Sequence, residues 1–175
     1  MQMITHGIST GALFLLAGLI YDRIHTRDMM KMGGFWSKAP FMGTITLVFV
    51  LASLGLPGLG NFIAEFLTLI GTWPASHSLT ILAAIGIVFA TAYSLRIMQK
   101  IFLGNERGMV HQLTDLNARE KLMLLPMVIV IVWLGLFPQT VLKTSKNVMT
   151  EILRIEKKTI SEADLIKDKT GISDE

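Results

Sequence analysis

Between residues 39 and 95 the chain carries one charged residue, Glu65. Uncharged runs also occupy residues 1–21 and 122–142. A helix needs about 20 predominantly apolar residues to cross the hydrocarbon core of a bilayer. The sequence therefore predicts an all-α, multi-pass integral membrane helix bundle with about four crossings. The expected crossings are residues 3–21, 41–71, 79–95 and 122–142, and together they form a domain of residues 1–142.

The composition limits the chemistry of the chain. Hydrophobic residues make up 51% of the sequence and charged residues 17%, a balance that suits a membrane protein. There is no cysteine, which excludes disulfides, iron–sulfur clusters and thiolate zinc sites within the chain. The net charge of +3 comes without a basic patch interleaved with aromatics. We expect no catalytic, metal or cofactor site in this chain and no nucleic acid partner.

Basic residues alternate between the expected loops. The first and third loops are rich in Lys and Arg, whereas the second, over residues 72–78, contains none. The positive-inside rule places the first and third loops in the cytoplasm or its organellar equivalent. The tail after residue 142 is also basic. Both assignments cannot hold with four crossings, so the side of the tail stays open.

The second crossing is too long to be one helix. The 33 residues between Pro40 and Pro74 would form a helix of about 50 Å, against a hydrocarbon core of about 30 Å. Pro57, Gly58 and Gly60 supply a break, because proline removes a backbone donor and glycine tolerates non-helical angles. The sequence predicts a helix that is discontinuous at Pro57 to Gly60, with a simple proline kink as the alternative.

Glu65 follows this break at about mid-depth in the membrane. A charge there costs at least about 2.5–3.5 kcal/mol, so an intramembrane carboxylate indicates a functional group, here a proton relay. The alternative is a carboxyl that stays protonated, or pairs with a basic residue, for assembly alone. Asn61, Glu65 and Thr68 stand at i, i+4 and i+7, so Asn61 and Thr68 are predicted to support Glu65 on one helical face.

The first predicted helix holds a second polar patch. His6 is followed by Ser9 and Thr10 at i+3 and i+4. Histidine titrates near neutrality and can pass a proton through its two nitrogens, which suits a relay. A hydrogen bond between helices is an equal alternative for His6.

The two ends of the chain carry weaker signals. Apolar residues recur at helical spacing over residues 143–160, which predicts an amphipathic surface helix. Residues 161–175 are predicted to be disordered. No targeting peptide is visible, and the start of the chain within about two residues of its first span indicates the C-terminal piece of something longer.

Three motifs carry a family resemblance. They are the string HGISTGALFLLAGLIYDRIHTRD from His6 to Asp28, LASLGLPG over residues 51–58 and NFIAEF over residues 61–66. Together they resemble the C-terminal half of the antiporter-like subunit M family of proton-translocating NADH:quinone oxidoreductase, respiratory complex I. The resemblance implies that His6 and Glu65 belong to a membrane-embedded chain of proton-relaying residues, with Glu65 on a discontinuous helix in the outlet half.

The resemblance also implies partners for the chain and a part of the subunit that the chain lacks. The family's first repeat, with its Glu–Lys pair and the central lysine, has no counterpart here, so the chain should not pump alone. Expected partners are the missing N-terminal part of the same subunit, the other membrane-arm subunits and the lipid bilayer. The implied location is a bacterial inner membrane.

Three functions remain open from the sequence. The leading one is proton translocation within the oxidoreductase, with no redox or substrate site in this chain. The related alternative is a subunit of a multisubunit sodium/proton antiporter. The string YDRIHTR over residues 21–27 favours the oxidoreductase over this alternative. The third is an inert or assembly-only membrane fragment.

Overall fold

The structure is a computed structural model that describes residues 1–106, 108 and 110–170. Its described part confirms the all-α prediction. Six α-helices follow in order: α1 (Gln2–Ile24), α2 (Pro40–Ser53), α3 (Gly60–Thr72), α4 (His77–Met98), α5 (Ala118–Leu136) and α6 (Gln139–Thr170). Shorter turns are η1 (Phe35–Ser37), η2 (Gln99–Leu103), a π-helical continuation of α4, and η3 (Val110–Gln112). Residues 1–138 form one compact unit, a helix bundle, and the segment from Gln139 forms another.

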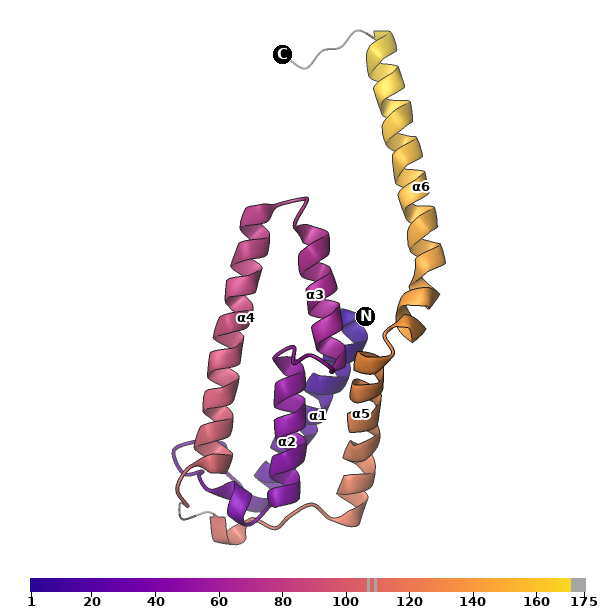
Figure 1. The fold of residues 1–175 in the computed structure, drawn as a ribbon. Helices are drawn as coiled ribbons and strands as arrows, with labels where there is room; N and C mark the ends of the chain where they lie inside the picture. The colour runs from indigo at the N-terminus through magenta and orange to yellow at the C-terminus, as the bar shows by residue number, and fades with distance from the viewer. Residues whose placement is uncertain (107, 109, 171–175) are drawn as a thin grey trace. The chain divides into compact units, whose positions relative to one another are not determined.

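Helix α1 lies behind α2 in the view of Figure 1, packed along α2 and α5 and touching α3. Ala12, Leu16 and Ile20 recur every four residues on its inner face and are buried. They join Phe49 of α2 and Ile131 of α5 in the core. The buried face of α1 is therefore the one expected from helical periodicity.

Among the described residues, two helices, Gln2–Ile24 and His77–Leu103, are long and apolar enough to cross a membrane by length and composition. Helix α5 meets that criterion only together with the first part of α6. The predicted fourth crossing, residues 122–142, is not one continuous helix, because α5 stops at Leu136 and α6 begins at Gln139. Phe137 precedes Pro138, which disfavours helical angles, and it has φ −124° and ψ 59°.

The second predicted crossing is broken, as expected. Helices α2 and α3 have 14 and 13 residues, about 20 Å each, and six non-helical residues separate them. The break begins earlier than predicted, because α2 already ends at Ser53. Gly60 does not belong to the break, since it is the first residue of α3.

A glycine ends α2. Gly55 has φ 65°, and its N–H donates to the carbonyl of Ala52 at 3.1 Å. The N–H of Leu56 donates to the carbonyl of Leu51 at 3.1 Å. These two bonds form a Schellman motif, which satisfies carbonyls that a helix end otherwise leaves open. Glycine termination therefore stops α2 before Pro57 is reached.

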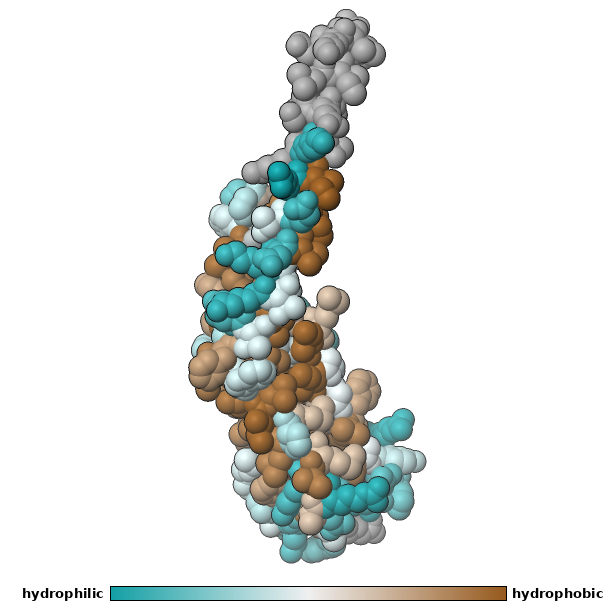
Figure 2. Space-filling view, turned by 90° about the vertical axis from the view of Figure 1, so that its right-hand side faces the viewer, coloured by the Kyte–Doolittle hydropathy of each residue, from teal (hydrophilic) through white to brown (hydrophobic). Residues whose placement is uncertain are grey.

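The two basic loops meet at one end of the bundle. Arg23 of α1 forms an ion pair of 2.7 Å with Glu120 of α5 and donates to the carbonyl of Thr114 at 2.9 Å. Ser37 donates to Glu106 at 2.6 Å. Figure 2 shows hydrophilic residues at this lower end and hydrophobic ones above it. The grouping of these loops agrees with the alternation of Lys and Arg.

Helix α6 is longer than the predicted surface helix of residues 143–160. It runs from Gln139 to Thr170, so residues 161–170, predicted to be disordered, are helical. Good helix formers such as Glu162, Ala163 and Leu165 lie in this stretch. Residues 171–175, the remainder of the predicted disordered tail, lie outside the described residues.

Candidate functional site

The start of α3 lies against the first turns of α1. A Cβ built on Gly60 would stand 2.7 Å from Cγ2 of Thr5 and 3.2 Å from Cβ of Leu134. Only glycine permits so close an approach, as small residues commonly do between membrane helices. Gly60 therefore acts in packing, and it brings the polar residues of the two helices together.

Asn61 is a fully buried polar residue of this contact, with 0% of its surface exposed. Its Nδ2 donates to Oγ of Ser9, also fully buried, at 3.1 Å. The Ser9 hydroxyl in turn donates to the carbonyl of His6 at 3.1 Å. Oδ1 of Asn61 is buried and accepts no hydrogen bond from the protein. A polar chain thus links α3 to α1 and ends in an open acceptor.

Glu65 lies one helical turn beyond Asn61 and is half-buried. The carboxylate of Glu65 lies against Gly55 at the end of α2, since a Cβ built on Gly55 would stand 2.5 Å from Oε2 of Glu65. Gln2 and His6, one helical turn apart at the start of α1, are the neighbours of Glu65 on the facing helix. The predicted relay residues Glu65 and His6 therefore belong to one site, shared between α1 and α3.

The hydroxyl groups of the predicted polar patch bind the backbone of His6. Ser9 and Thr10 donate to its backbone carbonyl, at 3.1 and 2.6 Å, and not to the ring. The His6 side chain is exposed on the bundle surface.

Thr68 does not join the site. Its side chain is exposed, and its hydroxyl donates to the carbonyl of Ala64 in its own helix at 2.8 Å. Helical spacing put Thr68 on the face of Asn61 and Glu65, but α1 covers only the first turns of α3. The described contacts of Thr68 thus give no support to the role predicted for it.

The break residues act through their backbone. Gly58 has φ 96°, in the left-handed region that favours glycine, and its carbonyl lies directly against Gly135 of α5. Pro57 is exposed at the turn between the two helices. These residues set where α3 begins and therefore where Glu65 stands.

Sequence reasoning missed two members of the site. Gln2 is a single amide at the first residue of α1, four residues before His6, and that spacing was the available signal. Gly55 was not among the predicted site residues, although a glycine just after a helical run is a typical end signal. Their approach to Glu65 depends on how the two helices pack.

A separate carboxylate fixes the other end of α2. Asp115 accepts hydrogen bonds from the backbone N–H groups of Phe41 and Met42, both at 2.9 Å, and from that of Leu116 at 2.8 Å. Burial raises the pKa of Asp115, but the three N–H donors, with Lys121 nearby, outweigh it and hold this pKa below its ordinary value. Asp115 supplies the N-terminal cap of α2 from a distant loop.

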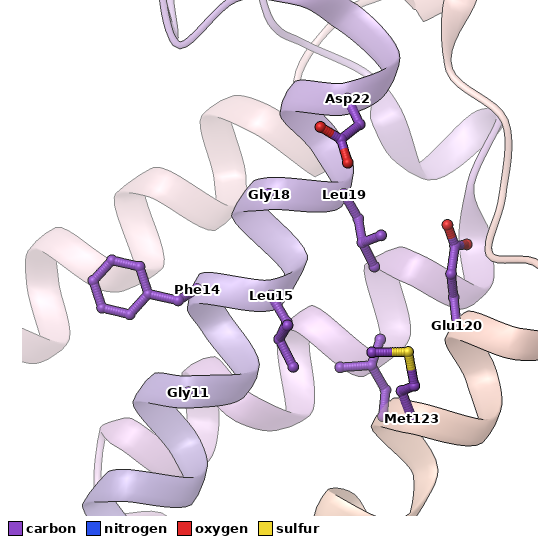
Figure 3. A pocket seen from close by; sticks show the side chains of 9 residues that line it. Gly11, Phe14, Leu15, Gly18, Leu19, Asp22, Glu120 and Met123 are labelled. Atoms are coloured by element: carbon purple, nitrogen blue, oxygen red, sulfur yellow. The ribbon is translucent and has the colours of Figure 1, made fainter.

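A pocket of about 360 Å³ lies between α1 and α5 and contains none of the predicted relay residues (Figure 3). Its wall is mainly apolar, with two acidic side chains at one end. The lining residues are Gly11, Phe14, Leu15, Gly18, Leu19, Asp22, Glu120, Met123 and Leu124.

Relatives and solved structures agree on one family. Subunit M of the NADH-quinone oxidoreductase of Pseudomonas aeruginosa is 46% identical over 144 residues, which cover 82% of this chain and 28% of the relative. The same subunit of Escherichia coli strain K12 is 40% identical over 153 residues, covering 86% of this chain and 30% of the relative. The chain thus spans less than a third of the length of these relatives.

Respiratory complex I from Thermus thermophilus with bound NADH contains a chain of similar fold. The TM-score is 0.71 and the identity 39%, over 75% of this chain and 28% of that one. The sequence model of the family described as NADH:quinone oxidoreductase/Mrp antiporter, transmembrane region, matches residues 1–91, the part that contains α1, the broken helix and the candidate site. The chain belongs to the NADH:quinone oxidoreductase/Mrp antiporter transmembrane family.

Proposed function

We propose that this chain conducts protons as the distal part of a membrane-arm subunit of NADH:quinone oxidoreductase, with Glu65 as the group that binds and releases the proton. One observation carries the proposal. Glu65 stands on the second half of a broken helix, its carboxylate folded over the glycine that ends the first half. Discontinuous membrane helices mark ion sites in transporters, because irregular backbone there lines a hydrated path.

The neighbours of Glu65 suit reversible protonation. Gln2 offers a neutral amide, and His6 offers an imidazole from the same face of α1. Neither forms a permanent ion pair that would lock the carboxylate in its charged form. A change in nearby charge can then load or unload Glu65.

The location and the partners belong to the same proposal. Relatives from Pseudomonas aeruginosa and Escherichia coli support a bacterial inner membrane. The partners are the other membrane-arm subunits and the N-terminal part of the same subunit, and the redox chemistry takes place outside this chain. The enzyme to which it contributes is the translocase as a whole.

The test compares Glu65→Gln with Glu65→Asp in the assembled oxidoreductase. Glutamine keeps the volume and the hydrogen-bonding shape but cannot exchange a proton, so proton translocation and coupled quinone reduction should fall severely. Aspartate keeps the titrating group and should retain more of both. Glu151→Gln, the same change at an exposed position of α6, is the matched control and should have no effect.

Two results would contradict the proposal. One is normal assembly of Glu65→Gln with wild-type rate and stoichiometry of proton translocation, which would leave Glu65 a structural residue. The other is transport that requires sodium ions and is lost without them, which would assign the chain to sodium/proton antiport.

A further inference from the structure

We infer that Ser9 and Asn61 form a positioning pair for Glu65. Their hydrogen bond fixes the rotation and the height of α3 against α1, and thereby the place of the Glu65 carboxylate. The bond joins Nδ2 of Asn61 to Oγ of Ser9 at 3.1 Å, and both residues are fully buried. The inference rests on the proposed role of Glu65 and adds two residues that act on it through the packing of the two helices.

The Ser9 hydroxyl can only accept a hydrogen bond from α3. It has one hydrogen, which it donates to the carbonyl of His6 at 3.1 Å. Its oxygen therefore offers lone pairs alone, and a partner on α3 must bring a hydrogen. The Asn61 amide brings one on Nδ2, whereas an ionised carboxylate has none. Ser9 thus accepts Asn61 and has no hydrogen bond to give to a charged Glu65.

This selectivity sets the register of α3. The neighbours of Asn61 in sequence are Gly60 and Phe62, which have no side-chain donor. Rotating α3 by one residue would therefore break the bond and leave the buried amide of Asn61 without an acceptor, which is costly. Sliding α3 by one helical turn would bring Glu65 to Ser9, an acceptor against an acceptor. The bond is made at one rotation and one height of the helix.

The glycine contact beside the pair does not supply this direction. A Cβ built on Gly60 would stand 2.7 Å from Cγ2 of Thr5, so the two helices approach closely at this point. A glycine has no side chain that would resist sliding or rotation of one helix on the other. Gly60 therefore sets the distance between α1 and α3, and the bond between Ser9 and Asn61 sets their register.

The register of α3 decides where the Glu65 carboxylate lies. Glu65 follows Asn61 by one helical turn, so a rotation or slide of α3 moves both residues together. Oε2 of Glu65 lies against Gly55 at the end of α2, where a Cβ would stand 2.5 Å from it. Loss of the pair should therefore move the carboxylate away from the helix break and change the surroundings in which it binds a proton.

Stability alone does not explain the pair. Oδ1 of Asn61 is buried and accepts no hydrogen bond from the described residues, which costs free energy. Hydrogen bonds between side chains of membrane helices contribute little to stability on average. A buried Asn in a coiled coil likewise fixes register at a cost in stability. The benefit of Asn61 is therefore the direction of its bond.

Proton translocation by the assembled oxidoreductase, measured over a range of pH, tests the inference. Ser9→Ala removes the acceptor and Asn61→Ala removes the donor. Each should lower the rate about three- to tenfold, the effect of one hydrogen bond on an equilibrium. Each should also displace the pH profile in the same direction. The double variant should show no more than either single change, because both act through one bond.

The pH profile reports on the surroundings of Glu65. Among the described helices packed against α3, α2 has no titratable group, and those of α1, α4 and α5 lie near the helix ends, with His6 of α1 beside Glu65. The variants alter none of these groups. A displaced profile therefore means that the carboxylate has moved relative to its neighbours.

Thr10→Val is the matched control. The Thr10 hydroxyl donates to the same carbonyl of His6, at 2.6 Å, so this variant removes a neighbouring hydroxyl and leaves the bond to Asn61 intact. It should keep the wild-type rate and pH profile. Ser9→Ala leaves Nδ2 of Asn61 buried without an acceptor. Should that variant fail to assemble, Asn61→Ala carries the same expectation, because the Ser9 hydrogen keeps its own partner.

Wild-type rate and pH profile in Asn61→Ala would overturn the inference. Fewer assembled complexes, each with the wild-type rate and profile, would also overturn it, as would failure of both single variants to assemble, because these results describe a pair that only holds the bundle together. The proposed function is judged separately by Glu65→Gln. Loss of transport in that variant, with wild-type transport in Asn61→Ala, would refute the positioning pair alone.

Discussion

Gly135→Ala should destabilise the bundle at the helix break. Gly135 is buried in α5, directly against the carbonyl of Gly58. A methyl group there would stand 2.6 Å from the carbonyl carbon of Gly58 and 2.7 Å from that of Leu59, whereas ordinary van der Waals contact begins at 3.4 Å. The backbone of the break, or all of α5, must therefore move by at least 0.8 Å.

The magnitude follows from two opposing effects. Alanine in place of glycine favours a helix by up to about 1 kcal/mol. Overpacking costs about 1–3 kcal/mol, and the upper part of that range applies because the opposing atoms are backbone, held by the hydrogen bond from the N–H of Leu59 to the carbonyl of Leu56. We expect a net loss of about 1–2 kcal/mol in the free energy of unfolding.

The assay is unfolding of the chain in mixed detergent micelles, titrated with a denaturing detergent and followed by helical circular dichroism. Gly86→Ala is the matched control, since Gly86 lies inside α4 and a Cβ there meets nothing within 4 Å. That variant should be neutral or slightly stabilised. Equal stability of the two variants would refute the close approach of α5 to the break.

Two further predictions concern the loop end of the bundle. Asp115→Asn should lower stability by about 1 kcal/mol at neutral pH, because it weakens the cap of α2. The folded-state pKa of Asp115 is depressed, so its contribution to stability is present above its ordinary pKa and disappears as pH falls through the lower folded value. The stabilities of wild type and variant should therefore converge in acid melts, and a constant difference at all pH values would contradict this. Arg23→Lys should cost about 1–3 kcal/mol in the same unfolding titration, because lysine cannot reproduce the bonds of the guanidinium to Glu120, Thr114 and Leu19, and an unchanged midpoint would show that this network contributes nothing.

The sequence by itself determined the helical class and the break, and it predicted the role of Glu65. These follow from quantities that are local along the chain: the length of uncharged runs against bilayer thickness, the angles available to glycine and proline, and the cost of a carboxylate in lipid. The end of α5 at Leu136 was missed because the apolar run continues past it, and only the effect of Pro138 on Phe137 stops the helix.

Tertiary structure alone decided which polar groups meet. Asn61 and Thr68 share a face by helical spacing, yet only Asn61 is covered by α1, because Gly60 lets the two helices approach at that one turn. Gln2 lies more than 60 residues from Glu65 in sequence, and no local pattern connects them. Spacing along a helix fixes the direction of a side chain, but its partner depends on which neighbouring helix fills the space in front of it, and that is a property of the whole packed bundle.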